Sequence, residues 1–337
     1  APRDPDVLIA RHMPFGQLMW LGVAGQLNDP LTTVWTRLMG PFIELFGTEL
    51  SLGRFVCLML GCFVTLLIWA VIGGAISRAA ALQLCRDERV GPRASLGFAL
   101  RKFPAYVAGP LYPLAGVALY AAVVFLFIGL PMNLDIGLVW AGFWWPLVLA
   151  VGTAVAVLLL GFAAGWPLMW ATISVEGADS FDALSRSYAY ALGRPLYYLF
   201  YVALAGFVGA LAWIVVLLAG EAVIYVSWWA ADWGVFDEGR MSAVMAAADG
   251  APLPEAGGAA RTGVALFQLG NGMLRTITFS FAYSFFWVSA TAVYLLLRRE
   301  VDHTETDEVF VDEDAEPFGL PPLEDDATAT DKPDSDA

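Results

Sequence analysis

Five apolar runs of roughly 20 residues or more limit what this chain can fold into more than any other feature of its sequence. They lie near residues 55–76, 109–130, 146–169, 196–220 and 276–297. Each run is long enough for an α-helix to cross the ~30 Å hydrocarbon layer of a bilayer. Tryptophans flank the third run on both sides, as is typical of membrane–water interfaces. The sequence therefore predicts an all-α fold, a polytopic transmembrane helix bundle of five or six spans.

The composition is that of a membrane protein once the charge has been located along the chain. Hydrophobic residues make up 59% and charged residues 15%, against roughly 45–50% and 25% in soluble domains. The net charge of −14 comes from residues 300–337, which hold 15 of the 32 acidic side chains and one basic side chain, Lys332. This segment is predicted to be a disordered acidic tail, whereas the rest of the chain is electrically balanced.

The segment before the first run has the features of a helix start but is interrupted by polar residues and proline. Asp29 is a suitable N-cap, Pro30 suits the first helical position, and apolar residues follow at helical spacing. An interfacial helix pair over residues 13–50 is favoured, with a broken or re-entrant span as the alternative. The predicted domains are the interfacial or re-entrant segment 1–54, the bundle 55–299 and the tail 300–337.

Basic side chains gather in the loops at one end of the predicted spans. They occur after the first and third runs, and the fifth run ends with Arg298 and Arg299. The loop at residues 131–137, at the other end, carries no Lys or Arg. Because Lys and Arg are enriched in cytoplasmic loops, the sequence places these loops and the C-terminus in the cytoplasm. With five spans, the N-terminal segment would lie outside.

The two basic loops contain diverged copies of one sequence. Residues 95–112 (SLGFALRKFPAYVAGPLY) and 180–197 (SFDALSRSYAYALGRPLY) share identical Ser, Arg, Pro, Leu and Tyr residues at a constant offset. Each copy predicts a short amphipathic interfacial helix that leads into a span. In the second copy, Ser180 or Asp179 would cap the start and Gly193 would end the helix in a left-handed conformation. In the first copy, Ser95 would cap the start and Pro104 would stop the helix.

The simplest role of these interfacial helices is to brace the loops, with arginines that set the topology. The alternative is that they bind anionic lipid headgroups or a cytoplasmic protein, since each basic residue near an anionic surface adds ~1 kcal/mol. The predicted apolar faces are Leu96, Ala99 or Leu100, and Phe103 in the first helix, and Phe181, Leu184, Tyr188 and Ala191 or Leu192 in the second. The candidate contact residues are Arg78, Arg86, Arg89, Arg93, Arg101, Lys102, Arg186 and Arg194.

Three segments carry a resemblance to a known group of proteins: residues 69–84 (WAVIGGAISRAAALQL), residues 95–112 and residues 174–201. They resemble a group of uncharacterised bacterial multi-helix membrane proteins that is similar to the membrane domain attached to some glycerophosphodiester phosphodiesterases. The resemblance implies a helical architecture with interfacial helices, in a bacterial inner membrane. It implies no catalytic residues, because the metal-binding Glu, Asp and His clusters of a phosphodiesterase domain have no place in a chain with two histidines.

The sequence contains none of the motifs that would indicate catalysis or a cofactor. It has no phosphate-binding G-x-x-x-x-G-K-[ST] loop, no H-E-x-x-H zinc motif and no G-x-S-x-G nucleophile motif. Its cysteines, Cys57, Cys62 and Cys85, lack metal-ligand spacing. The apolar runs hold no Asp, Glu, Lys or Arg, whereas pumps and coupled transporters need ionisable groups at membrane depth. We therefore expect no catalytic residue, metal site or cofactor.

Small and hydroxyl side chains indicate how the helices associate. Gly161 and Gly165 form a GxxxG pair, which favours helix packing within the bundle over homodimerisation and leaves the oligomeric state open. Polar side chains along the fifth run predict interhelical hydrogen bonds, with the lining of a solute path as the alternative. These residues are Asn271, Thr276, Thr278, Ser280, Ser284, Ser289 and Thr291.

Apolar residues among the carboxylates of the tail are candidate docking points, either for a partner or for the protein's own basic loops: Phe310, Phe318, Leu320 and Leu323. The sequence thus favours a non-enzymatic scaffold or accessory factor that acts through its interfacial helices and acidic tail. Membrane lipids and a cytoplasmic protein, rather than nucleic acid, are the expected partners. A permease or channel for a neutral or lipid-like solute is the alternative, and a lipid-modifying enzyme comes third.

Overall fold

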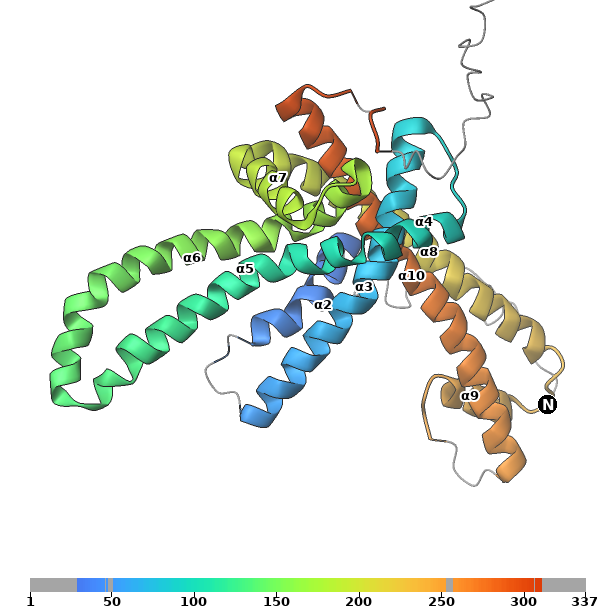
Figure 1. Ribbon diagram of the computed structural model, residues 1–337. Coiled ribbons are helices and arrows are strands. Elements are labelled where there is room, and N and C mark those ends of the chain that lie inside the picture. The colour runs from blue at the N-terminus through green and yellow to red at the C-terminus, as the bar shows by residue number, and fades with distance from the viewer. Residues whose placement is uncertain (1–28, 46, 48–50, 253–256, 306, 311–337) are drawn as a thin grey trace, which may run out of the picture.

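The computed structural model describes residues 29–45, 47, 51–252, 257–305 and 307–310, and every regular element in these residues is a helix (Figure 1). Five of the helices in these residues are long and apolar enough to cross a membrane. They are α3 (Leu52–Arg86), α5 (Phe103–Val124) with its continuation to Asn133, α6 (Asp135–Glu176), α8 (Pro195–Asp232) and α10 (Gly258–Asp302). The predicted all-α bundle with five long apolar helices is confirmed.

Four shorter helices complete the described elements: α2 (Pro30–Glu44), α4 (Pro92–Arg101), α7 (Ser180–Gly193) and α9 (Glu238–Ala248). α5 continues through a π-helical turn, Phe125–Gly129, and a 3-10 turn, Pro131–Asn133. Of the predicted disordered tail, residues 300–302 belong to α10, whereas residues 311–337, with the candidate docking residues Phe318, Leu320 and Leu323, lie outside the described residues.

The long helices extend well past the apolar runs. α6 has 42 residues, which is about 63 Å at 1.5 Å per residue and twice the thickness of the hydrocarbon layer. Pro146 and Pro167 lie inside α6, and the helix is visibly curved in Figure 1. It ends where Gly177 adopts a φ of +63°, a conformation that glycine takes without strain. The extra length carries the last turn of α6 beyond the apolar run.

The helices converge at one end of the molecule and diverge toward the other (Figure 1). α4 and α7 pack there against the C-terminal ends of α3, α6 and α10, and we call this region the packed end. The buried residues of α3 begin only at Cys62, and a continuous buried stretch of α6 runs from Gly165 to Val175. At the opposite, open end, the α5–α6 hairpin and the α8–α10 pair point in different directions.

Tryptophan rings hold the long helices together in the core. Trp170 of α6 and Trp287 of α10 are 1% and 0% exposed, and their rings stack with centroids 4.6 Å apart. Gly73 of α3 packs against both rings, because a Cβ at this position would lie 2.7 Å from Trp287 and 2.8 Å from Trp170. Close approach of backbones through small residues is the usual way in which transmembrane helices pack.

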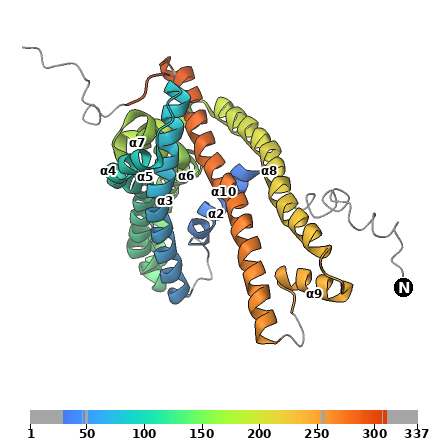
Figure 2. The ribbon, with the colours of Figure 1, turned by 90° about the vertical axis from the view of Figure 1, so that its right-hand side faces the viewer.

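α2 lies inside the bundle, between α3 and α10 in Figure 2. Its buried residues Val34, Leu38 and Met39 belong to the same core cluster as the tryptophans. Its N-cap Asp29 lies against Gly206 of α8, with Oδ2 3.1 Å from where a Cβ would be. Gly206 lies ten residues into the apolar run 196–220 of α8, about 15 Å along the helix. α2 therefore places a carboxylate beside an apolar run that holds none of its own.

The GxxxG pair of α6 brings a helix of the same chain close to it. A Cβ at Gly161 would overlap the ring of Tyr188 in α7, and one at Gly165 would lie 3.5 Å from the main-chain oxygen of Ser187. Tyr188 also donates a 2.6 Å hydrogen bond to the main-chain oxygen of Leu158. The pair thus serves the α6–α7 contact within the bundle.

The two sequence copies both place a short helix before a long one, but their helix ends differ from the predicted ones. α7 begins at Ser180, with Asp179, one of the two predicted caps, as its N-cap. α4 begins earlier than predicted, at Pro92, so the predicted cap at Ser95 is wrong. The break after α4 falls at Lys102, and Pro104 lies in the first turn of α5. Proline is tolerated in a first turn, where its missing N–H would have no helical partner, so Pro104 begins the long helix and does not stop the short one.

The helix break after α7 lies at Arg194, the residue that precedes Pro195. Gly193 is not left-handed, because among the described residues only Gly177 and Gly250 are glycines with positive φ. Arg194 interrupts the helix instead, with φ −134° and ψ 65°. The ring of Pro195 disfavours helical geometry at the residue before it, so the proline places the break.

The faces that the two short helices bury against the protein are not the apolar faces predicted for the membrane interface, which stay a prediction. On α4, Phe98 and Ala99 are buried, whereas Leu96 and Leu100 are exposed. On α7, the buried residues are Ala183, Ser187, Tyr190 and Ala191, and Phe181 is exposed. Periodicity shows where apolar side chains lie on a helix, but it does not show whether protein or lipid will cover them.

Candidate functional site at the packed end

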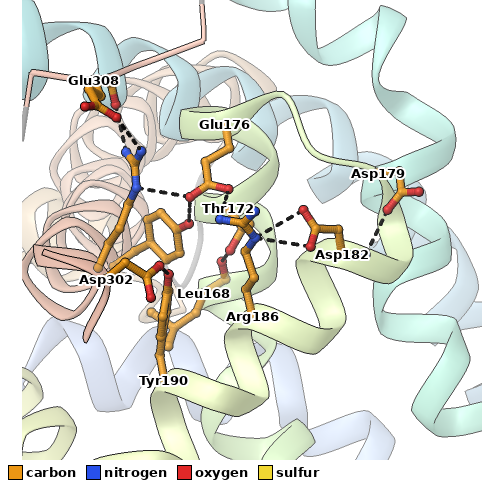
Figure 3. A network of polar contacts seen from close by, with 11 residues as sticks. Leu168, Thr172, Glu176, Asp179, Asp182, Arg186, Tyr190, Asp302 and Glu308 are labelled. Atoms are coloured by element: carbon orange, nitrogen blue, oxygen red, sulfur yellow. Dashed lines mark hydrogen bonds and ion pairs between the residues drawn. The ribbon is translucent and has the colours of Figure 1, made fainter. Parts of the chain in front are cut away.

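Glu176 in the last turn of α6 lies at the centre of a polar network (Figure 3). Its Oε2 is 2.6 Å from Nη1 of Arg186 in α7, and its Oε1 is 3.2 Å from Nε of Arg298 in α10. Tyr294 donates a 2.5 Å hydrogen bond to the same Oε1. A negative charge at a helix C-terminus is disfavoured by the helix dipole, and the two guanidinium groups offset this effect.

The network continues from both arginines. Nε of Arg186 is 3.1 Å from each carboxylate oxygen of Asp182, one turn earlier in α7. Arg298 donates from Nη1 to the main-chain oxygen of Glu308 at 2.8 Å, and its Nη2 lies 3.5 Å from the Glu308 carboxylate. The network therefore connects α6, α7, α10 and the residues that follow α10.

Tyr190 adds a further connection between α7 and α10. Its hydroxyl donates a hydrogen bond to the carboxylate of Asp302. Burial raises the pKa of Tyr190, and the hydrogen bond and the charge of Asp302 raise it further. The phenol is therefore neutral at physiological pH and keeps its proton for this hydrogen bond.

Two basic side chains bind the main chain where α6 ends. Arg78 of α3, which is 5% exposed, donates from Nη1 to the main-chain oxygen of Ser174 at 2.8 Å. Lys102, between α4 and α5, donates to the main-chain oxygen of Gly177 at 2.5 Å. The last carbonyls of a helix lack partners within the helix and carry partial negative charge. Arg78 and Lys102 thus cap α6 from neighbouring elements.

Phe310 binds beside these two cations. Its N–H donates to the main-chain oxygen of Val175 at 2.7 Å, and its own oxygen accepts a 2.7 Å hydrogen bond from Nη2 of Arg78. Its ring centre lies 5.7 Å from Nζ of Lys102. A Cβ on Gly177 would lie 2.7 Å from the same ring, so a side chain at position 177 would displace it. Main-chain and aromatic contacts therefore fix the start of the tail on the packed end.

The structure divides the eight predicted contact residues into two groups. Three of them bind groups of the bundle or of the chain end: Arg78, Lys102 and Arg186. The others lie exposed on the surface of the packed end: Arg86, Arg89, Arg93, Arg101 and Arg194. In this second group, Arg86 lies 3.8 Å from Glu88, and the guanidinium of Arg194 lies 5.8 Å from the ring centre of Tyr197.

The arrangement at the packed end can hold elements together and can hold a peptide segment. Both Glu176 and Asp182 bind Arg186, so these carboxylates are paired with an arginine and not with each other. Within the described ranges, no group of three or more His, Cys, Asp or Glu side chains is placed to hold a metal ion.

Five long apolar helices, with a polar network that joins α6, α7 and α10 at one end, are the architecture of a multi-pass helical membrane protein. Comparison with protein-family models, with curated proteins and with solved structures found no match to the chain. The resemblance to the membrane domain attached to some glycerophosphodiester phosphodiesterases therefore stays a prediction.

Sequence reasoning did not identify Glu176 as the centre of a site. The signal was present, because a glutamate in the last turn before a glycine opposes the helix dipole and needs a cation nearby. The sequence also identifies Asp29 as a helix cap. Its position in the middle of the bundle depends on the packing of α2 against α8, which no local pattern encodes.

Proposed function

We propose that this protein is a non-enzymatic scaffold or accessory factor of the bacterial inner membrane, with the packed end and the C-terminus in the cytoplasm. The orientation rests on the basic residues gathered at the packed end, since Lys and Arg are enriched on the cytoplasmic side. The observation that carries the proposed role is the anchoring of Phe310 by Arg78 and Val175. It gives the acidic segment 311–337 a fixed starting point beside exposed arginines.

The use of the charged groups supports a scaffold over the other two candidate functions. A lipid-modifying enzyme would need a carboxylate free to exchange a proton, and Glu176 is held by two arginines and Tyr294. A permease lined by α10 would need its hydroxyls to face a path. Four of its six hydroxyls in the predicted set, those of Thr276, Thr278, Ser280 and Thr291, instead donate hydrogen bonds to carbonyls of α10 itself.

Two kinds of partner fit this proposal. The exposed arginines suit anionic lipid headgroups, which they would meet where α3 and α4 leave the membrane. The acidic segment suits a cytoplasmic protein with a basic surface, because opposite charges steer association and fix orientation.

Truncation after Phe310 is the test of the proposed role. Removing residues 311–337 takes away the acidic segment but leaves the contacts of Asp302, Glu308 and Phe310 with the bundle. We expect the truncated protein to insert into the inner membrane normally and to lose proteins that crosslink to the full-length chain in cells. A Phe310→Ala variant of the full chain controls for the anchoring itself. An unchanged set of crosslinked proteins after truncation would refute the scaffold role.

A further inference from the structure

A cavity of about 330 Å³ lies between α2, α6, α8 and α10, beside Asp29. Its volume is within the range of pockets that bind small molecules, roughly 300–1,000 Å³. Most of its wall is apolar and includes Trp35, Leu168, Val202 and Phe286. The polar part of the wall is what distinguishes it from a simple packing gap.

Asp29 places a carboxylate on this wall. Its oxygens accept hydrogen bonds from the main-chain N–H groups of Leu31 and Thr32, at 3.1 Å and 3.2 Å. A carboxylate can accept about four hydrogen bonds, so acceptor positions remain for a ligand. Among the described residues that line the cavity, none is a lysine or arginine. The wall therefore favours a ligand that brings positive charge or N–H donors.

Ser289 of α10 provides a second, independent polar group. It is 7% exposed and lines the same cavity. Thr278 and Thr291, its hydroxyl-bearing neighbours on α10, donate to carbonyls of their own helix. The Ser289 hydroxyl makes no hydrogen bond with any part of the chain that the structure describes. Because Ser289 lines the cavity, a ligand bound there can hydrogen-bond to this hydroxyl.

We propose that this cavity binds a small amphiphile of the bilayer that consists of an apolar body and one protonated amine. An ammonium group has three N–H donors, which suit the open acceptor positions of Asp29 and the oxygen of Ser289. The apolar body lies along Trp35 and Phe286. An anionic head group is rejected, because it would face the Asp29 carboxylate with like charge. The site is separate from the proposed scaffold role, since it lies in the middle of the bundle and not at the packed end.

Three probes with the same ten-carbon chain and different head groups test the proposal: decylamine, decanol and decanoate. Binding to the full-length protein in detergent is measured by native mass spectrometry. We expect decylamine to bind at one site at least about tenfold more tightly than decanoate, the factor that corresponds to about 1.4 kcal/mol. Equal affinity for the amine and the carboxylate would refute the proposal.

The Asp29→Asn variant removes the charge and keeps a good helix cap, because Asn and Asp are equally suitable N-caps. We expect its affinity for decylamine to fall to that of decanol. Asp135→Asn, which changes a carboxylate at the far end of α6, is the matched control and is expected to bind as the wild type does.

A substitution that fills the cavity is a second test of whether decylamine binds there. Ala290 lines the cavity, and Ala290→Phe is expected to abolish decylamine binding while Asp29 remains. Decylamine binding that survives either Asp29→Asn or Ala290→Phe at wild-type affinity would show that the amine binds elsewhere.

Discussion

The carboxylate of Glu176 and the guanidinium of Arg298 lie 3.2 Å apart, with 12% and 11% of their side chains exposed. Removing one partner of a buried ion pair leaves the other charge without compensation and typically destabilises a protein by about 3–5 kcal/mol. Because Arg186 still binds Glu176, we expect Arg298→Met to lower the free energy of unfolding by about 2–4 kcal/mol. Denaturant unfolding in detergent, followed by tryptophan fluorescence, measures this change.

The neighbouring Arg299 provides the control for this prediction, because its side chain is exposed. Arg299→Met is expected to change the free energy of unfolding by less than about 0.5 kcal/mol, as is usual for surface substitutions. Equal changes in the free energy of unfolding for the two substitutions would mean that the Glu176–Arg298 ion pair does not stabilise the protein.

Gly177→Ala is expected to destabilise the packed end for two reasons. The left-handed conformation at this position disfavours any residue with a Cβ by roughly 1–2 kcal/mol, and the new methyl group would contact the ring of Phe310. The second effect disappears when Phe310 is changed to alanine, so the two substitutions are expected to be non-additive by at least about 0.5 kcal/mol.

Unfolding of the two single variants and of the double variant gives this coupling energy directly. Hydrogen exchange at the Phe310 amide, which donates to Val175, is expected to become faster in Gly177→Ala. Gly193→Ala is the matched control, since a Cβ there meets no atom within 4 Å. Additive effects of Gly177→Ala and Phe310→Ala would contradict the contact between the two positions.

Arg78→Lys tests whether the shape of the guanidinium matters in addition to its charge. Arg78 binds the main-chain oxygens of Ser174 and Phe310 with two different nitrogens and lies 4.2 Å from the ring centre of Phe98. A lysine keeps the charge but offers neither the planar fork nor the stacking surface. We expect a loss of about 1–3 kcal/mol in the free energy of unfolding, whereas Arg86→Lys, at an exposed position, should leave it unchanged.

The exposed arginines of the packed end are expected to bind anionic lipid. With ~1 kcal/mol for each basic residue, replacing Arg89 and Arg93 by Gln together should weaken phosphatidylglycerol binding by about 30-fold. Native mass spectrometry of the protein with added lipid measures the affinity. The control is the pair Arg240→Gln and Arg261→Gln, which changes two exposed arginines far from the packed end. Similar losses in both double variants would argue against a lipid site at the packed end.

The long helices could be predicted from the sequence because their signal is local. An apolar run of about 20 residues specifies a helix by itself, and all five predicted runs lie within long helices of the structure. The cap of α7 at Asp179 was equally predictable, since an N-cap depends on residues only two or three positions away.

The contacts that make the candidate site were not predictable, because they join residues distant in sequence. Arg78 reaches Phe310 across 232 positions, and Tyr294 reaches Glu176 across 118. The sequence shows that Arg78 is basic and lies in a loop region, which suggests a surface role. Only packing shows that α4 and the end of the chain cover it.

The position of α2 in the bundle was also not predictable from the sequence. Its apolar spacing predicts a helix correctly, but the same spacing suits a membrane surface and a bundle interior. Burial of Val34, Leu38 and Met39 against the tryptophan core distinguishes the two. The position of Asp29 against α8 follows from that packing and not from its neighbours in sequence.

The convergence of the helices at the packed end gives the molecule a tapered profile (Figure 1). In a bilayer that it spans, a tapered protein occupies more area in one leaflet than in the other and acts as a wedge. We expect lateral pressure to act mainly on the free arms, the α5–α6 hairpin and the α8–α10 pair, and therefore expect the spacing of these arms to change with membrane curvature.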